Sequence, residues 1–66
     1  MTILVNGESY ELDEEKSLLA LIAELGFQNR KIAVELNELI VPSTKYSEVT
    51  IKEGDKLEIV HAIGGG

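Results

Sequence analysis

The chain has 66 residues, 44% hydrophobic and 27% charged, which is the composition of one small globular domain. It contains no cysteine, so disulfides, thiolate metal sites and a persulfide carried on this chain are excluded. The net charge of −6 repels phosphate backbones, and a nucleic-acid partner is therefore not expected.

No targeting or metal-binding segment is predicted. Residues 1–7 lack a basic stretch followed by a long apolar run, so no signal peptide is expected. The longest apolar run, Leu18–Ala23, is much shorter than the roughly 20 residues that cross a membrane. The acidic run Asp13–Glu15 lacks the spaced oxygen ligands of a calcium loop, so no metal site is expected. We expect a cytoplasmic protein without a membrane partner.

The N-terminal residues predict a β-hairpin. Residues 2–5 are apolar or β-branched, and Asn6-Gly7 is a strong hairpin signal because a type I′ turn needs positive φ at both central positions. Over residues 9–13 polar residues alternate with Tyr10 and Leu12. This alternation predicts a second strand with one buried face.

One helix is predicted after the hairpin. Ser17 can act as its N-cap through the side-chain hydroxyl. Gly26 followed by Phe27 resembles a Schellman stop with its hydrophobic closure. Between these signals apolar residues recur with the i, i+3, i+4 and i+7 spacing of a buried helix face: Leu18, Leu21, Ile22 and Leu25.

Strands are predicted for most of the remaining chain. A period of two over residues 32–37 indicates a third strand. Residues 39–41 form a short strand that Pro42 ends, because proline lacks a ladder donor. A loop over 43–47, a short strand or turn over 48–51, and a last strand over 57–63 follow.

These elements predict an α+β domain over residues 1–63, with one helix packed across a mixed four- to five-stranded sheet, and a flexible glycine tail over 64–66. A right-handed crossover through the helix would place the first and last strands side by side and parallel. The predicted core consists of Ile3 or Leu4, Val5, Leu12, Leu18, Leu21, Ile22, Leu25, Ile32, Val34, Leu36, Leu57 and Ile59.

Four features together resemble the ThiS family of sulfur carriers in thiamine biosynthesis: the Asn6-Gly7 turn, the single helix, the stretch 32–37, and the ending 55–66. The resemblance spans nearly the whole chain. A terminal glycine pair is weak evidence alone, and its specificity comes from following the last strand of a β-grasp pattern. Glu38 departs from the family pattern, in which glycine would follow Asn37. The resemblance implies a ubiquitin-like β-grasp fold.

The resemblance also implies a chemistry at the C-terminus. A ThiF-like adenylating enzyme would use ATP to activate the carboxylate of Gly66, and sulfur transfer would convert it to a thiocarboxylate, a C-terminal 1-thioglycine. Thiazole synthase (ThiG) would then receive the sulfur. The chain would be a carrier with no bound cofactor rather than an enzyme, and a monomer when free.

The terminal residues suit this role. A carboxylate is a poor acyl donor and must be activated before a sulfur nucleophile can attack it. Gly64 and Gly65 lack Cβ, so they can pass through a channel too narrow for side chains. Val60, Ala62 and Ile63 lie too near the terminus to be well covered by one helix, and we expect them to dock on partners.

Three other functions are compatible with the same pattern. The small subunit of molybdopterin synthase shares the fold and the Gly-Gly ending, although it is usually longer. A ubiquitin-like protein modifier would form an isopeptide bond to lysine, and a plain β-grasp interaction module would not use its tail. A lone histidine such as His61 is assigned no chemistry, and the role of Tyr46 is left open.

Overall fold

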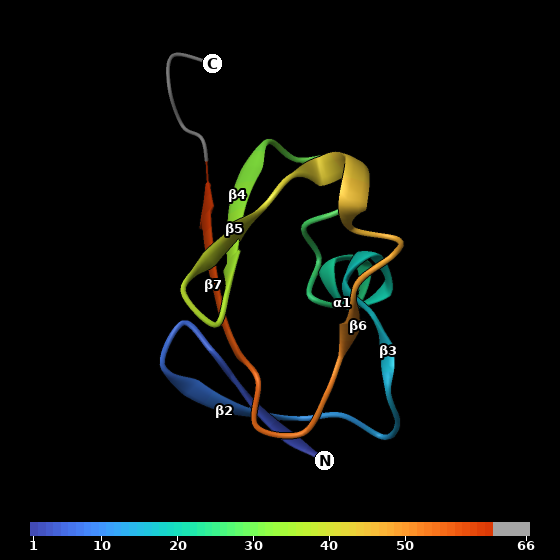
Figure 1. The fold of residues 1–66 in the computed structure, drawn as a ribbon, viewed down its shortest axis with the longest axis vertical. Helices are drawn as coiled ribbons and strands as arrows, with labels where there is room; N and C mark the ends of the chain where they lie inside the picture. The colour runs from blue at the N-terminus through green and yellow to red at the C-terminus, as the bar shows by residue number, and fades with distance from the viewer. Residues whose placement is uncertain (62–66) are drawn as a thin grey trace.

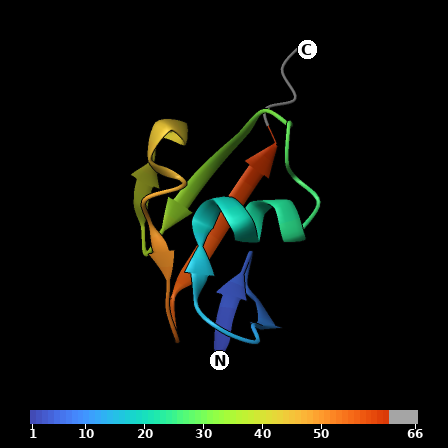
Figure 2. The ribbon, with the colours of Figure 1, turned by 90° about the vertical axis from the view of Figure 1, so that its right-hand side faces the viewer.

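The computed structural model describes residues 1–61, which form a five-stranded mixed sheet with one α-helix lying across one face (Figures 1 and 2). This confirms the α+β architecture predicted from the sequence. Predictions made for Ala62, Ile63 and the three terminal glycines lie outside the described residues. None of the helices in residues 1–61 has the length and apolar character needed to cross a membrane.

The elements follow the predicted order with two additions. The five-stranded sheet has the strand order β2-β1-β7-β4-β5, and β1 and β7 are parallel neighbours, as predicted for the first and last strands. The additions are β3, which was not predicted, and the 3-10 helix η1 in the predicted loop. The elements are β1 (Thr2–Val5), β2 (Glu8–Glu11), β3 (Lys16–Ser17), α1 (Leu18–Glu24), β4 (Ile32–Leu36), β5 (Leu39–Val41), η1 (Ser43–Lys45), β6 (Thr50–Ile51) and β7 (Lys56–His61).

Both hairpins turn through two residues with positive φ. Asn6 and Gly7 have φ of 51° and 85°, which confirms the predicted tight turn between β1 and β2. Asn37 and Glu38 have φ of 52° and 73° between β4 and β5. Glu38 thus occupies the left-handed position where glycine was expected, at a cost on the order of 1 kcal/mol.

The helix begins and ends where its sequence signals predict. The hydroxyl of Ser17 accepts a hydrogen bond from the Ala20 N–H at 3.0 Å, so Ser17 is the N-cap. At the other end Gly26 has φ of 89°, and the Phe27 N–H donates to the Ile22 carbonyl at 3.0 Å. With the bond from the Gly26 N–H to the Ala23 carbonyl at 3.0 Å, this is the Schellman motif predicted from Gly26-Phe27.

The N-terminus of α1 is also held by a segment that comes much later in the chain. The Leu18 N–H donates to the Val49 carbonyl at 2.8 Å, and the Leu19 N–H donates to the Tyr46 carbonyl at 3.0 Å. β3 pairs with β6 in a separate two-stranded sheet just before the helix. Donors in the first helical turn have no partner within the helix, so these bonds satisfy groups that would otherwise be unpaired.

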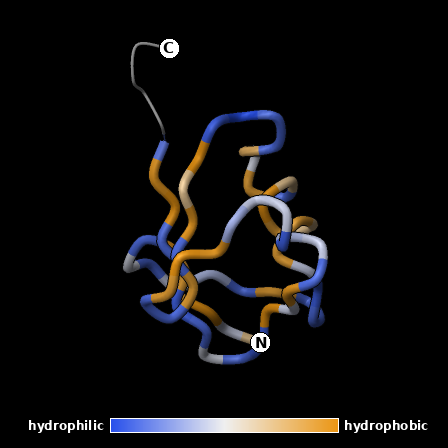
Figure 3. Tube along the Cα trace, turned by 45° about the horizontal axis from the view of Figure 1, so that its top comes forward, coloured by the Kyte–Doolittle hydropathy of each residue, from blue (hydrophilic) through white to orange (hydrophobic). Residues whose placement is uncertain are grey.

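The core agrees with the predicted faces and contains three further residues. Ile3 rather than Leu4 points inward, and the predicted Val5, Leu25, Ile32 and Leu36 are half-buried against the core. Figure 3 shows apolar residues recurring along β7, which leads into the grey trace, and along the neighbouring β4. Val41, Tyr46 and Ile51 were missed because their segments are too short to show a period. The buried side chains are Ile3, Leu12, Leu18, Leu21, Ile22, Val34, Val41, Tyr46, Ile51, Leu57 and Ile59.

A polar contact at the surface joins three elements. The carboxylate of Glu24 on α1 accepts hydrogen bonds from the Lys16 ammonium on β3 and from the Tyr10 hydroxyl on β2. The bond from Lys16, followed by that from Tyr10, lowers the pKa of Glu24 below its ordinary value of 4.5. The same contacts raise the pKa values of Tyr10 and Lys16. The charged carboxylate therefore helps to fix α1 against the hairpin.

This contact predicts an acid-dependent stability difference between the parent and Glu24→Gln. Because the pKa of Glu24 is lower in the folded than in the unfolded state, its stabilisation is complete above pH 4.5 and is lost as the pH falls through the folded-state pKa. The variant should have a lower melting temperature than the parent at neutral pH. This difference in melting temperature should disappear in acid. Circular dichroism melts at low salt measure this, because salt screens exposed pairs.

Glu15→Gln is the matched control, since Glu15 is exposed and makes no hydrogen bond or ion pair within residues 1–61. At neutral pH, the melting temperature of Glu15→Gln should differ less from that of the parent than the melting temperature of Glu24→Gln does. A Glu24→Gln gap that stays constant from neutral pH to below pH 4.5 would contradict the assignment.

Candidate functional site

The end of β7 is the point from which the predicted tail continues. β7 is the middle strand of the sheet and pairs with β4 from Leu36–Leu57 to Ile32–His61. On its other side β1 reaches only as far as Val5, opposite Leu57. Figure 1 shows β7 rising beyond β1 and β2 and continuing into the grey trace. The last residues of β7 therefore have a strand on one side only.

The side chain of Asn6 takes the place of a strand next to Ile59. The Ile59 N–H donates to Asn6 Oδ1 at 2.8 Å, and Asn6 Nδ2 donates to the Ile59 carbonyl at 3.3 Å. The Asn6 N–H also donates to the Leu57 carbonyl at 2.8 Å. A primary amide carries the same donor and acceptor pair as a peptide group, so Asn6 extends the pairing of β7 by one more residue.

Asn37 holds the start of β7 in the same way. The Lys56 N–H donates to Asn37 Oδ1 at 2.9 Å, and the Asn37 N–H donates to the Lys56 carbonyl at 2.8 Å. Asn37 Nδ2 also donates to Asp55 Oδ1 at 3.0 Å. The sequence pattern places Asn6 in a turn and Asn37 at the end of a strand, and it does not reveal these bonds. The one available signal was that asparagine is the first of the two turn residues in both hairpins.

Val60 is exposed on the sheet face opposite the helix, as predicted for a docking residue. Leu57 and Ile59 point toward the helix and are buried, whereas Val60 is 62% exposed. Its cross-strand neighbour is Ala33, and Ile40 on β5 is 75% exposed on the same face. We call Ala33, Ile40 and Val60 the open-face patch. These apolar side chains share the face with the exposed Glu35 and Glu58, and Ala33 and Val60 lie near the end of β7.

On the helix side, the end of β7 contacts the residue that closes the helix. The ring of His61 meets the ring of Phe27 edge to face, with centroids 4.9 Å apart and planes at 83°. Such pairs prefer this geometry and add a modest stabilisation beyond their buried area. His61 therefore has a structural contact, and Tyr46, whose role was open, is a buried core residue.

The side chains around the end of β7 can make contacts but offer no evident chemistry. Val60 is apolar, and His61 is in contact with Phe27. Within residues 1–61 no group of three or more His, Asp or Glu side chains is arranged to hold a metal ion. This part of the chain can position whatever follows His61 and can offer it a docking surface.

The sequence model of the ThiS family matches residues 3–66. The chain belongs to the ThiS family. The sulfur carrier protein ThiS of Bacillus subtilis is 32% identical over 63 residues, which cover 94% of this chain and 96% of that protein. The crystal structure of the thiamine biosynthesis protein ThiS from Geobacter metallireducens has a TM-score of 0.86 and 30% identity, with full coverage of both chains. This likeness confirms the predicted β-grasp fold.

Longer relatives contain a region similar to the whole of this ThiS-family chain. A thiazole synthase of Paramagnetospirillum magneticum is 47% identical over 66 residues, and one of Magnetococcus marinus is 41% identical over 66 residues. Each alignment covers 100% of this chain but 20% of the relative, so the chain spans about a fifth of their length. The name of those proteins describes the longer polypeptide.

Because the Asn6 amide is bonded to Ile59, we expect Asn6→Gly to loosen the end of β7. Glycine keeps the positive φ but removes both side-chain bonds to Ile59. Since one intramolecular hydrogen bond contributes about 0.5–1.5 kcal/mol, the free energy of unfolding should fall by about 1–2 kcal/mol. Urea unfolding measures this loss, and hydrogen exchange of the Ile59 amide should accelerate.

Asn29→Gly provides a matched control. Asn29 also has positive φ, 66°, but its side chain makes no hydrogen bond within residues 1–61. The control should leave exchange at Ile59 unchanged. Equal exchange rates at Ile59 in the parent and Asn6→Gly would show that the amide does not hold β7.

Proposed function

We propose that this ThiS-family chain is a sulfur carrier for thiazole formation in thiamine biosynthesis, and that the C-terminal carboxylate of Gly66 holds the sulfur. The observation that carries the proposal is that the family match extends through Gly66 and includes Gly64 and Gly65. The Geobacter relative is named a thiamine biosynthesis protein and the Bacillus relative a sulfur carrier protein ThiS, which favours this pathway over molybdopterin synthesis.

The proposed chemistry activates the carboxylate before sulfur is added. An α-carboxyl group has an ordinary pKa of roughly 3.5, so Gly66 would be an anion at neutral pH. In the active site of a ThiF-like adenylating enzyme, its oxygen attacks the α-phosphorus of ATP, and pyrophosphate leaves. A hydrosulfide ion (HS⁻) then attacks the acyl carbon, AMP leaves, and the new S–H group loses its proton. The product is the 1-thioglycine thiocarboxylate.

In this proposal the folded domain positions the tail and the partners supply the catalysis. β7 is hydrogen-bonded to β4 on one side and to β1 and Asn6 on the other, so the point where the tail begins is fixed. The carrier itself needs no bound cofactor, because ATP is the substrate of the adenylating enzyme. Thiazole synthase (ThiG) would take the sulfur from Gly66, consistent with the synthases that contain a similar region.

Val60, Ala62 and Ile63 are the proposed docking residues for these partners. Val60 is exposed in the open-face patch, and burying apolar surface contributes roughly 25 cal/mol per Å². Val60→Asp and Ile63→Asp should therefore weaken binding to the partners, measured by titration calorimetry. Leu39→Asp is the control, because Leu39 is 73% exposed but lies on β5 opposite Leu36, at the end of β4 away from His61. Unchanged affinity of both variants for both partners would place the docking surface elsewhere.

The tail itself gives the sharpest prediction. Deleting Gly66, or adding one alanine after it, should abolish thiocarboxylate formation while leaving the fold intact. One extended residue spans at most ~3.3–3.6 Å, whereas a displacement of about 1 Å can already cost on the order of a hundredfold in rate. Gly65→Val should also reduce adenylation, because it puts a β-branched side chain into a narrow channel.

The measurements are ATP–pyrophosphate exchange and intact mass after incubation with the adenylating enzyme, ATP and a sulfur source. The parent should show one oxygen replaced by one sulfur. Circular dichroism melts serve as the folding control, and all variants should melt like the parent. Normal thiocarboxylate formation by the extended variant would rule out Gly66 as the reactive terminus.

A further inference from the structure

A groove of about 360 Å³ lies on the helix side of the molecule, and the proposed carrier chemistry does not use it. Its walls come from the exposed flank of α1, the segment after the helix, and the residue that follows η1. Leu19 is 49% exposed in one wall, although it lies on the helix beside the buried Leu18. Phe27, Ile32 and Tyr46 supply further apolar surface. This volume could receive one large apolar side chain.

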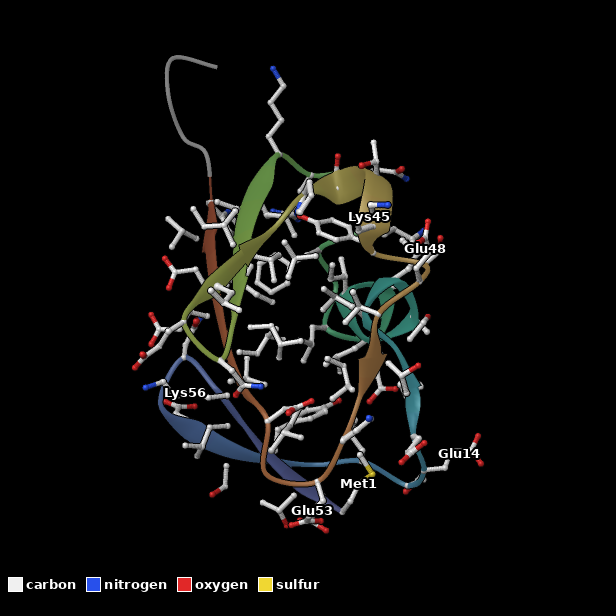
Figure 4. The ribbon with its side chains drawn as sticks, viewed as in Figure 1. Met1, Glu14, Lys45, Glu48, Glu53 and Lys56 are labelled. Carbon is white, nitrogen blue, oxygen red and sulfur yellow. The ribbon has the colours of Figure 1, made fainter. Side chains whose placement is uncertain are left out.

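Arg30 gives the groove a charge opposite to that of the whole protein. Among the described residues that line the groove, Arg30 is the one charged residue, in a chain with 12 acidic and 6 basic side chains. Arg30 forms no ion pair within residues 1–61, whereas Lys45, next to Tyr46 in the sequence, lies 3.8 Å from Glu48. In Figure 4 Lys45 lies at the end of the molecule where β7 leads out, and Glu14 and Glu53 lie at the opposite end. An arginine fork at the edge of an apolar groove suits a carboxylate.

The groove adjoins the origin of the tail. Phe27 lines it, and the same ring contacts His61, the last described residue of β7. A partner that encloses the residues after His61 is thereby brought close to Leu19 and Arg30. The contact between Phe27 and His61 is on the opposite side of the sheet from the open-face patch.

We propose that this groove receives a segment of thiazole synthase in which an apolar side chain is followed by a carboxylate. The apolar side chain would pack on Leu19 and Phe27, and the carboxylate would pair with Arg30. The inference rests on the proposed function, which makes the synthase a partner. We choose the synthase as the partner because two relatives of this chain are thiazole synthases. In each of them, a region similar to this entire chain is part of the synthase polypeptide.

The test is titration calorimetry of the full chain against thiazole synthase from the same organism. Leu19→Asp places a charge in the apolar wall, and Arg30→Glu reverses the charge beside it. Each should raise Kd by about tenfold or more, as expected for residues at the centre of an interface. Leu39→Asp is the control for the first variant, and Lys52→Glu, which makes the same change in net charge, is the control for the second. Both controls should change Kd by less than about twofold, in line with contacts outside an interface.

The outcomes separate this inference from the proposed function. Loss of affinity in the two groove variants alone, with melting curves like the parent's, supports the groove as a synthase site. Parental affinity in both groove variants overturns the inference and leaves the carrier function standing. Equal losses in the controls also overturn it, because net charge would then explain the effect. A parent that forms no complex with the synthase contradicts the proposed partner, and the groove site with it.

Discussion

The pairing of β7 on both sides is the constraint on which the rest of the structure depends. This strand carries Leu57 and Ile59 into the core, and its backbone groups must be satisfied within a sheet only five strands wide. β4 supplies an antiparallel neighbour from Leu57 to His61. β1 is parallel and stops at Val5, and the Asn6 amide covers the next unpaired position. Without that amide, two backbone groups of Ile59 would lose their partner near the place where the tail begins.

The helix is bound to this sheet by contacts at both of its ends as well as by its buried face. At the N-terminus, Ser17 and the carbonyls of Tyr46 and Val49 satisfy three backbone donors of the first turn. At the C-terminus the Schellman closure places Phe27 against His61. The helix has only seven residues, too few to be stable alone, so its formation and that of the sheet are coupled. A change at the helix stop would thus reach the end of β7.

Local signals in the sequence predicted most of the fold and little of the surface around the site. Asn6-Gly7, Ser17 and Gly26-Phe27 each act within a few residues, and each produced the predicted turn or cap. The bond between Asn6 and Ile59 joins residues 53 apart in the chain, and no short-range pattern encodes it. The groove likewise needs Leu19, Arg30 and Tyr46 together, which only the tertiary structure brings about. Glu38 shows the converse, because a strained position can be occupied without glycine when the strands on both sides fix the turn.

A tail made of glycine cannot distinguish one partner from another, because it offers a backbone without side chains. In the proposed function, selectivity for an adenylating enzyme or a synthase must therefore come from the folded domain. A stable interface covers ~800 Å² of each partner, which is close to a fifth of the 4455 Å² accessible surface of this chain. The open-face patch and the groove lie on opposite sides of β7, and a partner that surrounds the tail must approach both. Contacts on the two sides would fix the direction in which the tail enters, which a single flat patch could not do.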